Sequence, residues 1–348
     1  MQLKRIKIQN FRNYKEEEIE FNNKINIFYG NNAQGKTNIL ESIYLMSLGK
    51  SYRTNKEKEL IKKGESFSKL YCEFNKEDRD GKIEYFISEK KIIKVNGIKI
   101  DKLSELVGNI NIVMFVPEDI DIMKGSPAKR RKFLNIMIGQ LKNNYISNLN
   151  LYLKTLEQRN NYIKQKNINN DMLDIWDEKL VEYGYKIYQY RNEFINKIKE
   201  KIESIHKNIA DEKISLHYIS DCSDKENFLK KLKNNRKNDI EKGFTSSGIQ
   251  RDDFKVYVNG EDVSVYGSQG QNRTAVLSLK LAEIKVIYDE IGEYPILLLD
   301  DFMSELDEKR IKNFLKNIEK IQVIITCTKN IKIENSKSFN IIDGKVIK

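Results

Sequence analysis

A phosphate-binding loop near the N-terminus limits the architectures open to this chain. Residues Gly30 to Thr37 read G-N-N-A-Q-G-K-T and fill every position of the P-loop pattern. Apolar alternation over 25–29 predicts a strand that ends at the loop, and apolar residues at helical spacing over 39–48 predict a helix after it. Strand, glycine-rich loop and helix in this order predict an α/β domain built around a buried sheet.

The composition of the loop indicates which atoms of a nucleotide it would contact. Its glycines let successive backbone N–H groups point at phosphate oxygens in front of a helix N-terminus. We expect Lys36 to contact the β and γ phosphates of ATP and to act in catalysis, and the Thr37 hydroxyl to bind Mg²⁺. A chance match in an ordinary loop is the alternative, which the flanking strand and helix disfavour. The candidate nucleotide contacts here are Gly30, Asn31, Asn32, Ala33, Gln34, Gly35, Lys36 and Thr37.

A second source of oxygen ligands follows an apolar strand late in the chain. Residues 295–301 read P-I-L-L-L-D-D, in which the apolar run 296–299 suits a buried strand. Asp300 is placed to hold Mg²⁺ through its water shell, and Asp301 is placed to polarise the attacking water. The alternative is a pair of solvated acids at a strand end. The upstream P-loop favours the catalytic interpretation, with ATP and Mg²⁺ as cofactors.

The separation of these two motifs narrows the class of P-loop protein. Thr37 and Asp300 lie more than half the chain apart, so a whole domain must be inserted between them. Residues 267–274 read G-S-Q-G-Q-N-R-T and open a predicted helix, at the position of the signature motif in ABC-type ATPases. In that architecture the signature completes the nucleotide site of a partner subunit. A simple Ser N-cap is the alternative. The candidate contacts of this segment are Ser268, Gln269, Gly270 and Gln271.

Two further features follow the acids. Residues 304–307 read S-E-L-D and match the D-loop, which makes Asp307 a candidate contact with a nucleotide across a dimer. Thr326 stands where such ATPases usually have a switch histidine, and its hydroxyl can hold a water or a γ-phosphate oxygen but cannot carry charge. We therefore expect slow hydrolysis. Both histidines of the chain, His206 and His217, fall in the inserted region, where we interpret them as structural.

The remaining patterns divide the chain into a head and an arm. Residues 1–125 and 245–348 are predicted to form an ABC-type ATPase head, a mixed sheet with flanking helices, and residues 126–244 an inserted helical arm. An ordinary helical bundle is the alternative for the arm. Asn-Gly pairs at 96–97 and 259–260 predict two hairpins. Within these parts we expect strands over 110–116 and 323–326 and helices over 143–166, 171–206, 272–291 and 308–318.

The composition of the chain indicates which partners and which cellular compartment suit it. The net charge of +11 suits a polyanionic partner such as DNA, although abundant Lys, Asn and Ile also fit drift in an AT-rich genome. No apolar stretch approaches the roughly 18 residues that a membrane span needs, and the first residues alternate like a strand rather than forming a signal peptide. Three scattered cysteines without metal-type spacing indicate reduced thiols. We expect a cytoplasmic protein with no membrane partner.

These segments together resemble the RecF family of DNA replication and repair proteins, relatives of the SMC head domains. The similarity runs nearly end to end, and it is most specific in G-S-P-A-K-R-R-K-F-L (125–134) and S-Q-G-Q-N-R-T (268–274). It departs at 248–253, where the family usually shows G-P-H-R-D-D and this chain has G-I-Q-R-D-D. Further matching segments are F-R-N-Y (11–14), K-S-Y-R-T (50–54), L-E-Q-R-N (156–160) and L-L-L-D-D-F-M-S-E-L-D (297–307).

The resemblance implies an ATP-induced homodimer that binds single-stranded and duplex DNA at gap junctions. It also implies a slow, DNA-stimulated, Mg²⁺-dependent ATPase, cooperation with RecR, and, through RecO and RecR, the loading of RecA in the SOS response. Two other interpretations of the motifs stay open, an ATPase subunit of a transporter and a scaffold that binds ATP without hydrolysing it. The helical insertion, the missing switch histidine and the positive charge disfavour the transporter. Aspartate in place of the commoner glutamate at position 301 keeps the scaffold open.

Overall fold

The structure is a computed structural model, and it describes residues 1–77, 79–301, 314, 318–331 and 333–347 of the 348-residue chain. The predicted D-loop at 304–307, with Asp307, lies outside the described residues. The helix predicted over 308–318 also lies outside them, apart from Phe314 and Ile318.

The chain forms two compact units. The first comprises Met1–Asp119 and Glu283–Lys348, and the second comprises Ile120–Ala282. The second unit is therefore inserted into the first along the sequence, as the separation of the two nucleotide motifs requires. Helix α8 (Gln269–Ile291) runs from one unit into the other. The head and arm boundaries proposed at 126 and 245 stay a prediction.

The first unit is built on a six-stranded sheet. Across it lie β15 (Lys345–Ile347), β14 (Ser336–Ile342), β3 (Ile25–Tyr29), β13 (Val323–Cys327), β12 (Ile296–Asp300) and β8 (Ile112–Phe115). All neighbours are parallel except the β14–β15 hairpin. Strands β12 and β13 are fully buried, which explains why they read as apolar runs with polar residues only at their carboxyl ends. This arrangement confirms the predicted α/β class with a mixed sheet.

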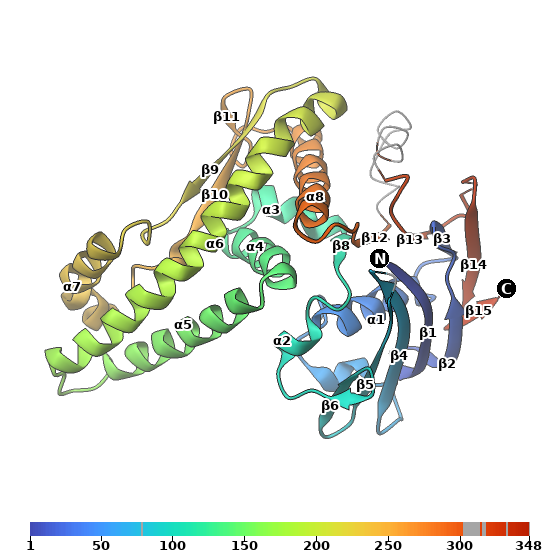
Figure 1. Cartoon of the computed structure of the whole chain (residues 1–348), viewed down its shortest axis with the longest axis horizontal. Coiled ribbons are helices and arrows are strands. Elements are labelled where there is room, and N and C mark those ends of the chain that lie inside the picture. The colour runs from blue at the N-terminus through green and yellow to red at the C-terminus, as the bar shows by residue number, and fades with distance from the viewer. Residues whose placement is uncertain (78, 302–313, 315–317, 332, 348) are drawn as a thin grey trace. The chain divides into compact units, whose positions relative to one another are not determined.

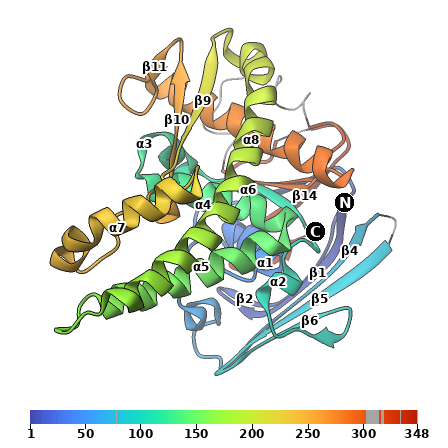
Figure 2. The same ribbon diagram turned by 60° about the vertical axis from the view of Figure 1, so that its left-hand side comes forward.

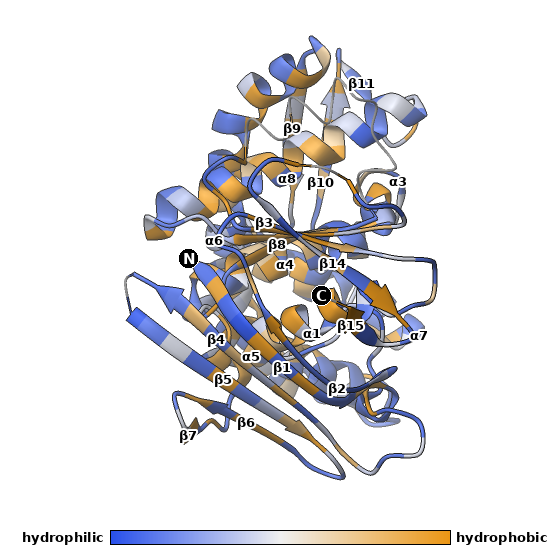
Figure 3. Cartoon of the chain, turned by 90° about the vertical axis from the view of Figure 1, so that its right-hand side faces the viewer, coloured by the Kyte–Doolittle hydropathy of each residue, from blue (hydrophilic) through white to orange (hydrophobic). Residues whose placement is uncertain are grey.

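A second, antiparallel sheet completes this unit. Across it lie β2 (Tyr14–Glu20), β1 (Gln2–Phe11), β4 (Ser68–Lys76), β5 (Arg79–Ile87), β6 (Lys91–Val95) and β7 (Ile98–Lys99). Apolar and polar residues alternate along β1, β4 and β5, so that one face is buried, as the orange and blue bands of Figure 3 show. Asn96 and Gly97, both with positive φ, form the predicted turn between β6 and β7.

Helix α1 (Lys36–Leu48) packs against strands of both sheets. Ile39, Leu40 and Ile43 are fully buried and join one apolar core with residues of both sheets. The helix ends at Gly49 in the left-handed region, where glycine carries no steric penalty. The short helical elements next along the chain are η1 (Glu57–Leu60), α2 (Leu103–Leu106) and η2 (Pro117–Ile120).

The second unit consists mainly of helices. They are α3 (Asp121–Lys124), α4 (Pro127–Leu141), α5 (Asn143–Tyr162), α6 (Asn170–Ala210), α7 (Lys225–Lys242), η3 (Ile249–Arg251) and the first part of α8. Helices α5 and α6 lie side by side in Figures 1 and 2 and confirm the two long helices predicted there. With 41 residues, α6 is about 60 Å long at a rise of 1.5 Å per residue.

Buried ion pairs join these helices. Fully buried Arg159 of α5 donates to Asp177 of α6 at 2.7 Å and to Asp239 of α7 at 2.9 Å. Arg191 of α6 donates to Asp252 at 2.6 Å. A buried pair of this kind requires one register, because a misplaced partner would leave a charge unpaired in a dry interior. Arg159 lies in L-E-Q-R-N, which carries the family resemblance, and Asp252 lies in the R-D-D that the departing segment 248–253 shares with the family. Both have structural partners here.

Gln250 stands where the resembling family usually has histidine. Its side-chain oxygen accepts a hydrogen bond from the Tyr152 hydroxyl at 2.6 Å, and its side-chain nitrogen donates to the Ser247 carbonyl at 2.7 Å. Gly248 beside it has a φ of +122°, and a Cβ there would lie 2.2 Å from the Tyr152 hydroxyl. The Gln250 amide therefore ties α5 to the 245–250 loop without an ionisable side chain at position 250.

A small antiparallel sheet lies in the same unit. It contains β9 (Ile214–Ile219), β10 (Asp253–Val258) and β11 (Glu261–Asp262), with the predicted hairpin turn at Asn259–Gly260. Strand β9 falls inside the region expected to be helical, and Figure 2 shows it beside β10. Within β9 only Ile214 and Leu216 are buried, so the strand offers few core positions.

The two histidines belong to this unit. Buried His206 places Nδ1 2.8 Å from the Ser278 hydroxyl oxygen, and burial lowers its pKa below the usual value. His217 on β9 is exposed and packs edge-on against the Tyr257 ring.

Among the described residues, no helix is both long and apolar enough to cross a membrane.

Candidate nucleotide-binding site

The P-loop joins the carboxyl end of β3 to the first turn of α1. Gly30 has a φ of +150°, and a Cβ there would lie 2.4 Å from the Ile341 carbonyl oxygen. Gly35 has a φ of +113°, and a Cβ there would lie 2.6 Å from the side-chain amide of Asn13. Both positions therefore require glycine for conformation and for space.

Residues at the β1–β2 turn and the β14–β15 turn form hydrogen bonds to the P-loop. The side chain of Asn13 donates to the Gln34 carbonyl at 2.9 Å, and the Tyr14 hydroxyl donates to the Gly35 carbonyl at 3.1 Å. The Asp343 N–H donates to the Gln34 side-chain oxygen at 2.6 Å. Asn13 and Tyr14 lie in F-R-N-Y, a segment whose role the sequence did not indicate. These bonds use acceptor oxygens of the loop, two from its backbone and one from the Gln34 side chain, which leaves its N–H groups for an anion.

Lys36 lies inside the loop. Its ammonium group donates to the carbonyls of Gly30 and Asn31, both at 2.8 Å, and only 6% of the residue is exposed. The loop thus folds around a positive charge at the N-terminus of α1. That is the electrostatic arrangement that a bound triphosphate needs.

Asp300 and Thr37 meet at the carboxyl edge of the parallel sheet. The Thr37 hydroxyl donates to Asp300 Oδ1 at 2.9 Å, and the Thr326 hydroxyl donates to the same oxygen at 2.7 Å. Strand register explains the meeting, since Asp300 pairs with Thr326 and Thr326 pairs with Phe28, two residues before the loop. The carboxyl ends of parallel strands are where such folds bind ligands.

These donors fit Mg²⁺. Thr37 directs its hydrogen at Asp300, which leaves the lone pairs of its hydroxyl oxygen for a cation, and Asp300 supplies carboxylate oxygens. Within the described part of the chain, no cluster of three or more His, Cys, Asp or Glu side chains could enclose a metal ion. The hydroxyl of Thr37 and the carboxylate of Asp300 are oxygen donors that suit Mg²⁺, which keeps several waters and takes its other ligands from substrate phosphates.

Asp301 directly follows β12. Its backbone is in the left-handed region, with a φ of +49°, and its N–H donates to the Thr326 hydroxyl oxygen at 3.0 Å. Thr326 is fully buried and so connects both acids, as a donor to Asp300 and as an acceptor from Asp301. Its direct contact with a nucleotide and the catalytic role of Asp301 stay predictions.

Tyr52 is a residue of this site that the sequence did not indicate. Its hydroxyl donates to Asp300 Oδ2 at 3.3 Å, and its ring packs edge-on against Tyr44 of α1. Burial, and then the negative charge of Asp300, raise the pKa of Tyr52 well above its usual value, so the phenol remains a donor. The only available signal was its place in K-S-Y-R-T.

Two arginines share one buried carboxylate beside α1. Glu41 has a fully buried side chain and accepts two hydrogen bonds from Arg12, at 2.8 and 2.6 Å, and one from Arg53 at 3.1 Å. The Arg53 side chain is 42% exposed. Two guanidinium groups on one carboxylate leave a surplus positive charge in the unit that carries the P-loop.

The signature segment lies in the other unit, at the start of α8. The Ser268 hydroxyl oxygen accepts from the Gln271 N–H at 3.1 Å, and the Gln271 side-chain oxygen accepts from the Ser268 N–H at 3.0 Å. This reciprocal pair is a capping box, so the N-cap interpretation of Ser268 is correct as local structure. It does not exclude the signature role, because Ser268 and Gln269 are exposed and the Ser268 hydroxyl hydrogen is not used in the box.

Gln271 also connects this segment to the arm. Its side-chain nitrogen donates to Glu212 Oε1 at 2.8 Å, and the same oxygen accepts from Asn259 at 3.1 Å. Glu212 lies between α6 and β9. The start of α8 is therefore bonded to the C-terminal end of the long helix region and to the β10–β11 turn.

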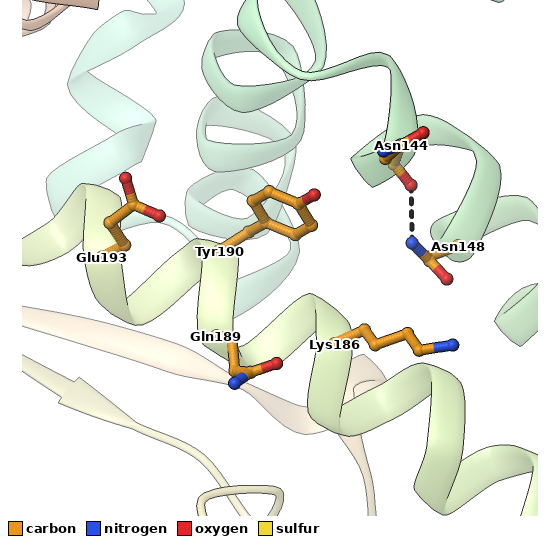
Figure 4. A pocket seen from close by; sticks show the side chains of 6 residues that line it. All are labelled: Asn144, Asn148, Lys186, Gln189, Tyr190 and Glu193. Atoms are coloured by element: carbon orange, nitrogen blue, oxygen red, sulfur yellow. Dashed lines mark hydrogen bonds between the residues drawn. The ribbon is translucent and has the colours of Figure 1, made fainter.

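A separate polar pocket lies on the arm, between α5 and α6 (Figure 4). It contains none of the predicted site residues, and Lys186 on its wall is paired with Glu182. Its lining residues are Asn144, Asn148, Lys186, Gln189, Tyr190 and Glu193. It lacks the glycine-rich backbone that makes the P-loop a phosphate site.

The chain is similar to known proteins over nearly its whole length. The RecF/RecN/SMC N terminal domain family matches residues 2–109. The DNA replication and repair protein RecF of Clostridium botulinum (strain ATCC 19397 / Type A) is 49% identical over 337 residues, which cover 94% of this chain and 93% of that protein. The RecF protein of Clostridium perfringens (strain SM101 / Type A) is 44% identical over 359 residues, 99% of each chain. A solved structure of the recombination mediator protein RecF-ATP in the RecFOR pathway matches with a TM-score of 0.94 and 40% identity, over 99% of this chain and 96% of that one.

Proposed function

Because the chain belongs to the RecF family, we propose that it is an ATP-dependent DNA-binding protein of replication and recombinational repair. The observation that carries this proposal is the meeting of Thr37 with Asp300 at 2.9 Å beside a P-loop folded around Lys36. The relative solved with ATP, at 40% identity, supports the same ligand for this loop. The proposed cofactors are ATP and Mg²⁺.

In the proposed reaction the loop N–H groups and Lys36 bind and orient the triphosphate. Thr37 and Asp300 hold Mg²⁺, which when bound neutralises charge on the β- and γ-phosphate oxygens. Asp301 orients and polarises the attacking water, and Thr326 fixes both acids through its hydroxyl. Thr326 cannot take the proton or the charge that a switch histidine would, so the hydrolysis we propose is slow and increases with DNA.

The second half of each nucleotide site comes from another copy of the chain. Ser268 and Gln269 are exposed at the N-terminus of α8, where backbone N–H groups and the Ser268 hydroxyl can bind a γ-phosphate. ATP then bridges two subunits and favours the dimer by its differential affinity for the closed state. Hydrolysis removes the bridge and opens the dimer.

DNA is the proposed partner of the closed dimer. The net charge of +11 favours a polyanion, and the family implies binding at junctions of single-stranded and duplex DNA at gaps. In that role the protein acts with RecR, and through RecO and RecR it promotes the loading of RecA in the SOS response. Cys72, Cys222 and Cys327 are free and buried, which suits the reducing cytoplasm in which we place it.

Light scattering tests this function in purified protein. We expect a monomer without nucleotide, a dimer with ATP and Mg²⁺, and a DNA-bound dimer when gapped DNA is added. Lys36→Ala should remain a monomer with ATP, because the β and γ phosphates then lack their main positive charge. Dimerisation of Lys36→Ala at the wild-type ATP concentration would show that the P-loop is not the nucleotide site. A dimer that forms but never hydrolyses ATP, with or without DNA, would favour the scaffold.

A further inference from the structure

Three hydroxyl groups surround the carboxylate of Asp300, and they divide unequally between its two oxygens. Thr37 and Thr326 both donate to Oδ1, at 2.9 and 2.7 Å. Tyr52 donates to Oδ2 at 3.3 Å. The terminal torsion of an aspartate is broad, so each hydrogen bond to either oxygen restrains the rotation of the carboxylate about its Cβ–Cγ bond. The Tyr52 hydroxyl, which donates to Oδ2, therefore restrains this carboxylate together with the two threonines.

The segment that carries Tyr52 is itself firmly held. The Ser51 hydroxyl oxygen accepts from the N–H groups of Arg53 and Thr54, and its hydrogen goes to Glu41. Arg53 donates to Asn38 at 2.7 Å and to Glu41 at 3.1 Å. Both acceptors belong to α1, so the segment is anchored to the helix that begins at the P-loop. A donor on an anchored segment can impose an orientation on its acceptor rather than follow it.

We propose that Tyr52 is a positioning residue for the metal site, which sets the orientation in which Asp300 meets Mg²⁺. This inference rests on the proposed function, since it assigns Mg²⁺ to Thr37 and Asp300. Tyr52 itself does not ligate the ion. Its phenol holds Oδ2, and the carboxylate then presents one orientation to the ion and its waters before nucleotide arrives.

The test replaces only the hydroxyl. Tyr52→Phe keeps the ring against Tyr44 and removes the donor to Oδ2. We expect Mn²⁺, used as a spectroscopic probe for Mg²⁺, to bind the protein complex with a slowly hydrolysed ATP analogue about fivefold more weakly, the usual effect of one hydrogen bond. The Mn²⁺ electron paramagnetic resonance spectrum should broaden as the site becomes less uniform. Nucleotide affinity measured with a chelator and no metal should not change.

Tyr85→Phe is the matched control. The Tyr85 hydroxyl is buried in the same unit and donates to the Gly49 carbonyl at 3.1 Å, not to either acid. It should leave Mn²⁺ affinity and spectrum at wild-type values while costing similar stability. In an Asp300→Asn background, Tyr52→Phe should have no further effect on the metal, because the residue acts through Asp300.

Each outcome separates the inference from the function on which it rests. Equal Mn²⁺ affinity and spectrum in wild type and folded Tyr52→Phe would overturn the positioning role. So would an equal loss in Tyr85→Phe, since that would indicate general destabilisation. Wild-type protein that binds no nucleotide at all would overturn the proposed function and the inference with it.

Discussion

Asp300 receives hydrogen bonds from residues that lie 263, 248 and 26 positions away in sequence, namely Thr37, Tyr52 and Thr326. Thr37 and Asp300 were both predicted to hold Mg²⁺, because the P-loop and the strand-end acid each have a recognisable local pattern. Tyr52 could not be predicted, since one tyrosine in a loop carries no signal of the carboxylate that folding brings to it. The bonds from Asn13 and Tyr14 to the back of the loop were missed for the same reason.

At this scale, Asp301→Asn separates binding from hydrolysis. The amide keeps the shape of the side chain and leaves Asp300 and Thr37 for Mg²⁺, but it polarises the attacking water poorly. We expect turnover to fall by roughly a hundredfold, the contribution of a general base, while ATP-bound dimers persist longer. Single-turnover hydrolysis and dimer lifetime after dilution measure the two effects. Unchanged turnover would remove Asp301 from catalysis.

Among the elements, those with a strong local pattern were predicted and those fixed by distant packing were not. The run I-L-L-L predicted β12, the spacing of apolar residues predicted α1 and α8, and Asn-Gly pairs marked both hairpin turns. Strand β9 escaped prediction, because it is only six residues long and its pairing partner β10 lies beyond α7. Likewise, no local sequence pattern indicates that Glu212 accepts a hydrogen bond from Gln271 in the first turn of α8.

The hydrogen bond from Gln271 to Glu212 predicts that the arm supports the start of α8, which carries the signature segment. Glu212→Ala removes the acceptor for Gln271 and Asn259, so the capping box loses its outside support. We expect ATP-dependent dimerisation to weaken about fivefold, equivalent to about 1 kcal/mol, with ATP affinity of the monomer unchanged. Sizing against ATP concentration measures this effect. Glu193→Ala on α6, which removes an acid paired with Lys197 instead, is the control and should dimerise normally. Normal dimerisation of Glu212→Ala would show that the contact is only structural.

At the scale of the whole molecule, charge and symmetry govern the proposed behaviour. In the proposed dimer, two copies of a chain with a net charge of +11 would bring a large positive charge to one DNA. Two half-sites on separate compact units, the P-loop in one and Ser268 in the other, allow reciprocal completion in a closed twofold dimer. The +11 value could be read from the sequence, whereas which Lys and Arg side chains contact phosphate could not, because composition does not assign charges to a face.

Salt dependence tests the electrostatic part of this account. DNA affinity of the ATP-bound dimer should fall steeply with salt, with a log–log slope of about −0.9 for each duplex phosphate neutralised. Titration of labelled gapped DNA at several salt concentrations gives the slope. A nearly flat response would indicate that a protein partner, and not DNA, is the main ligand.

The central claim is that each nucleotide site is shared between two subunits, and mixing two defective variants tests it most directly. Ser268→Arg should leave ATP binding by the monomer largely intact but block pairing, because a bulky cation fills the γ-phosphate position at the interface. Lys36→Ala should fail to pair for lack of a competent P-loop. A mixed dimer has one site with both lesions and one with neither. We therefore predict that light scattering detects ATP-dependent dimers in the mixture although neither variant pairs with itself. No mixed dimers, with both variants folded, would contradict the shared site.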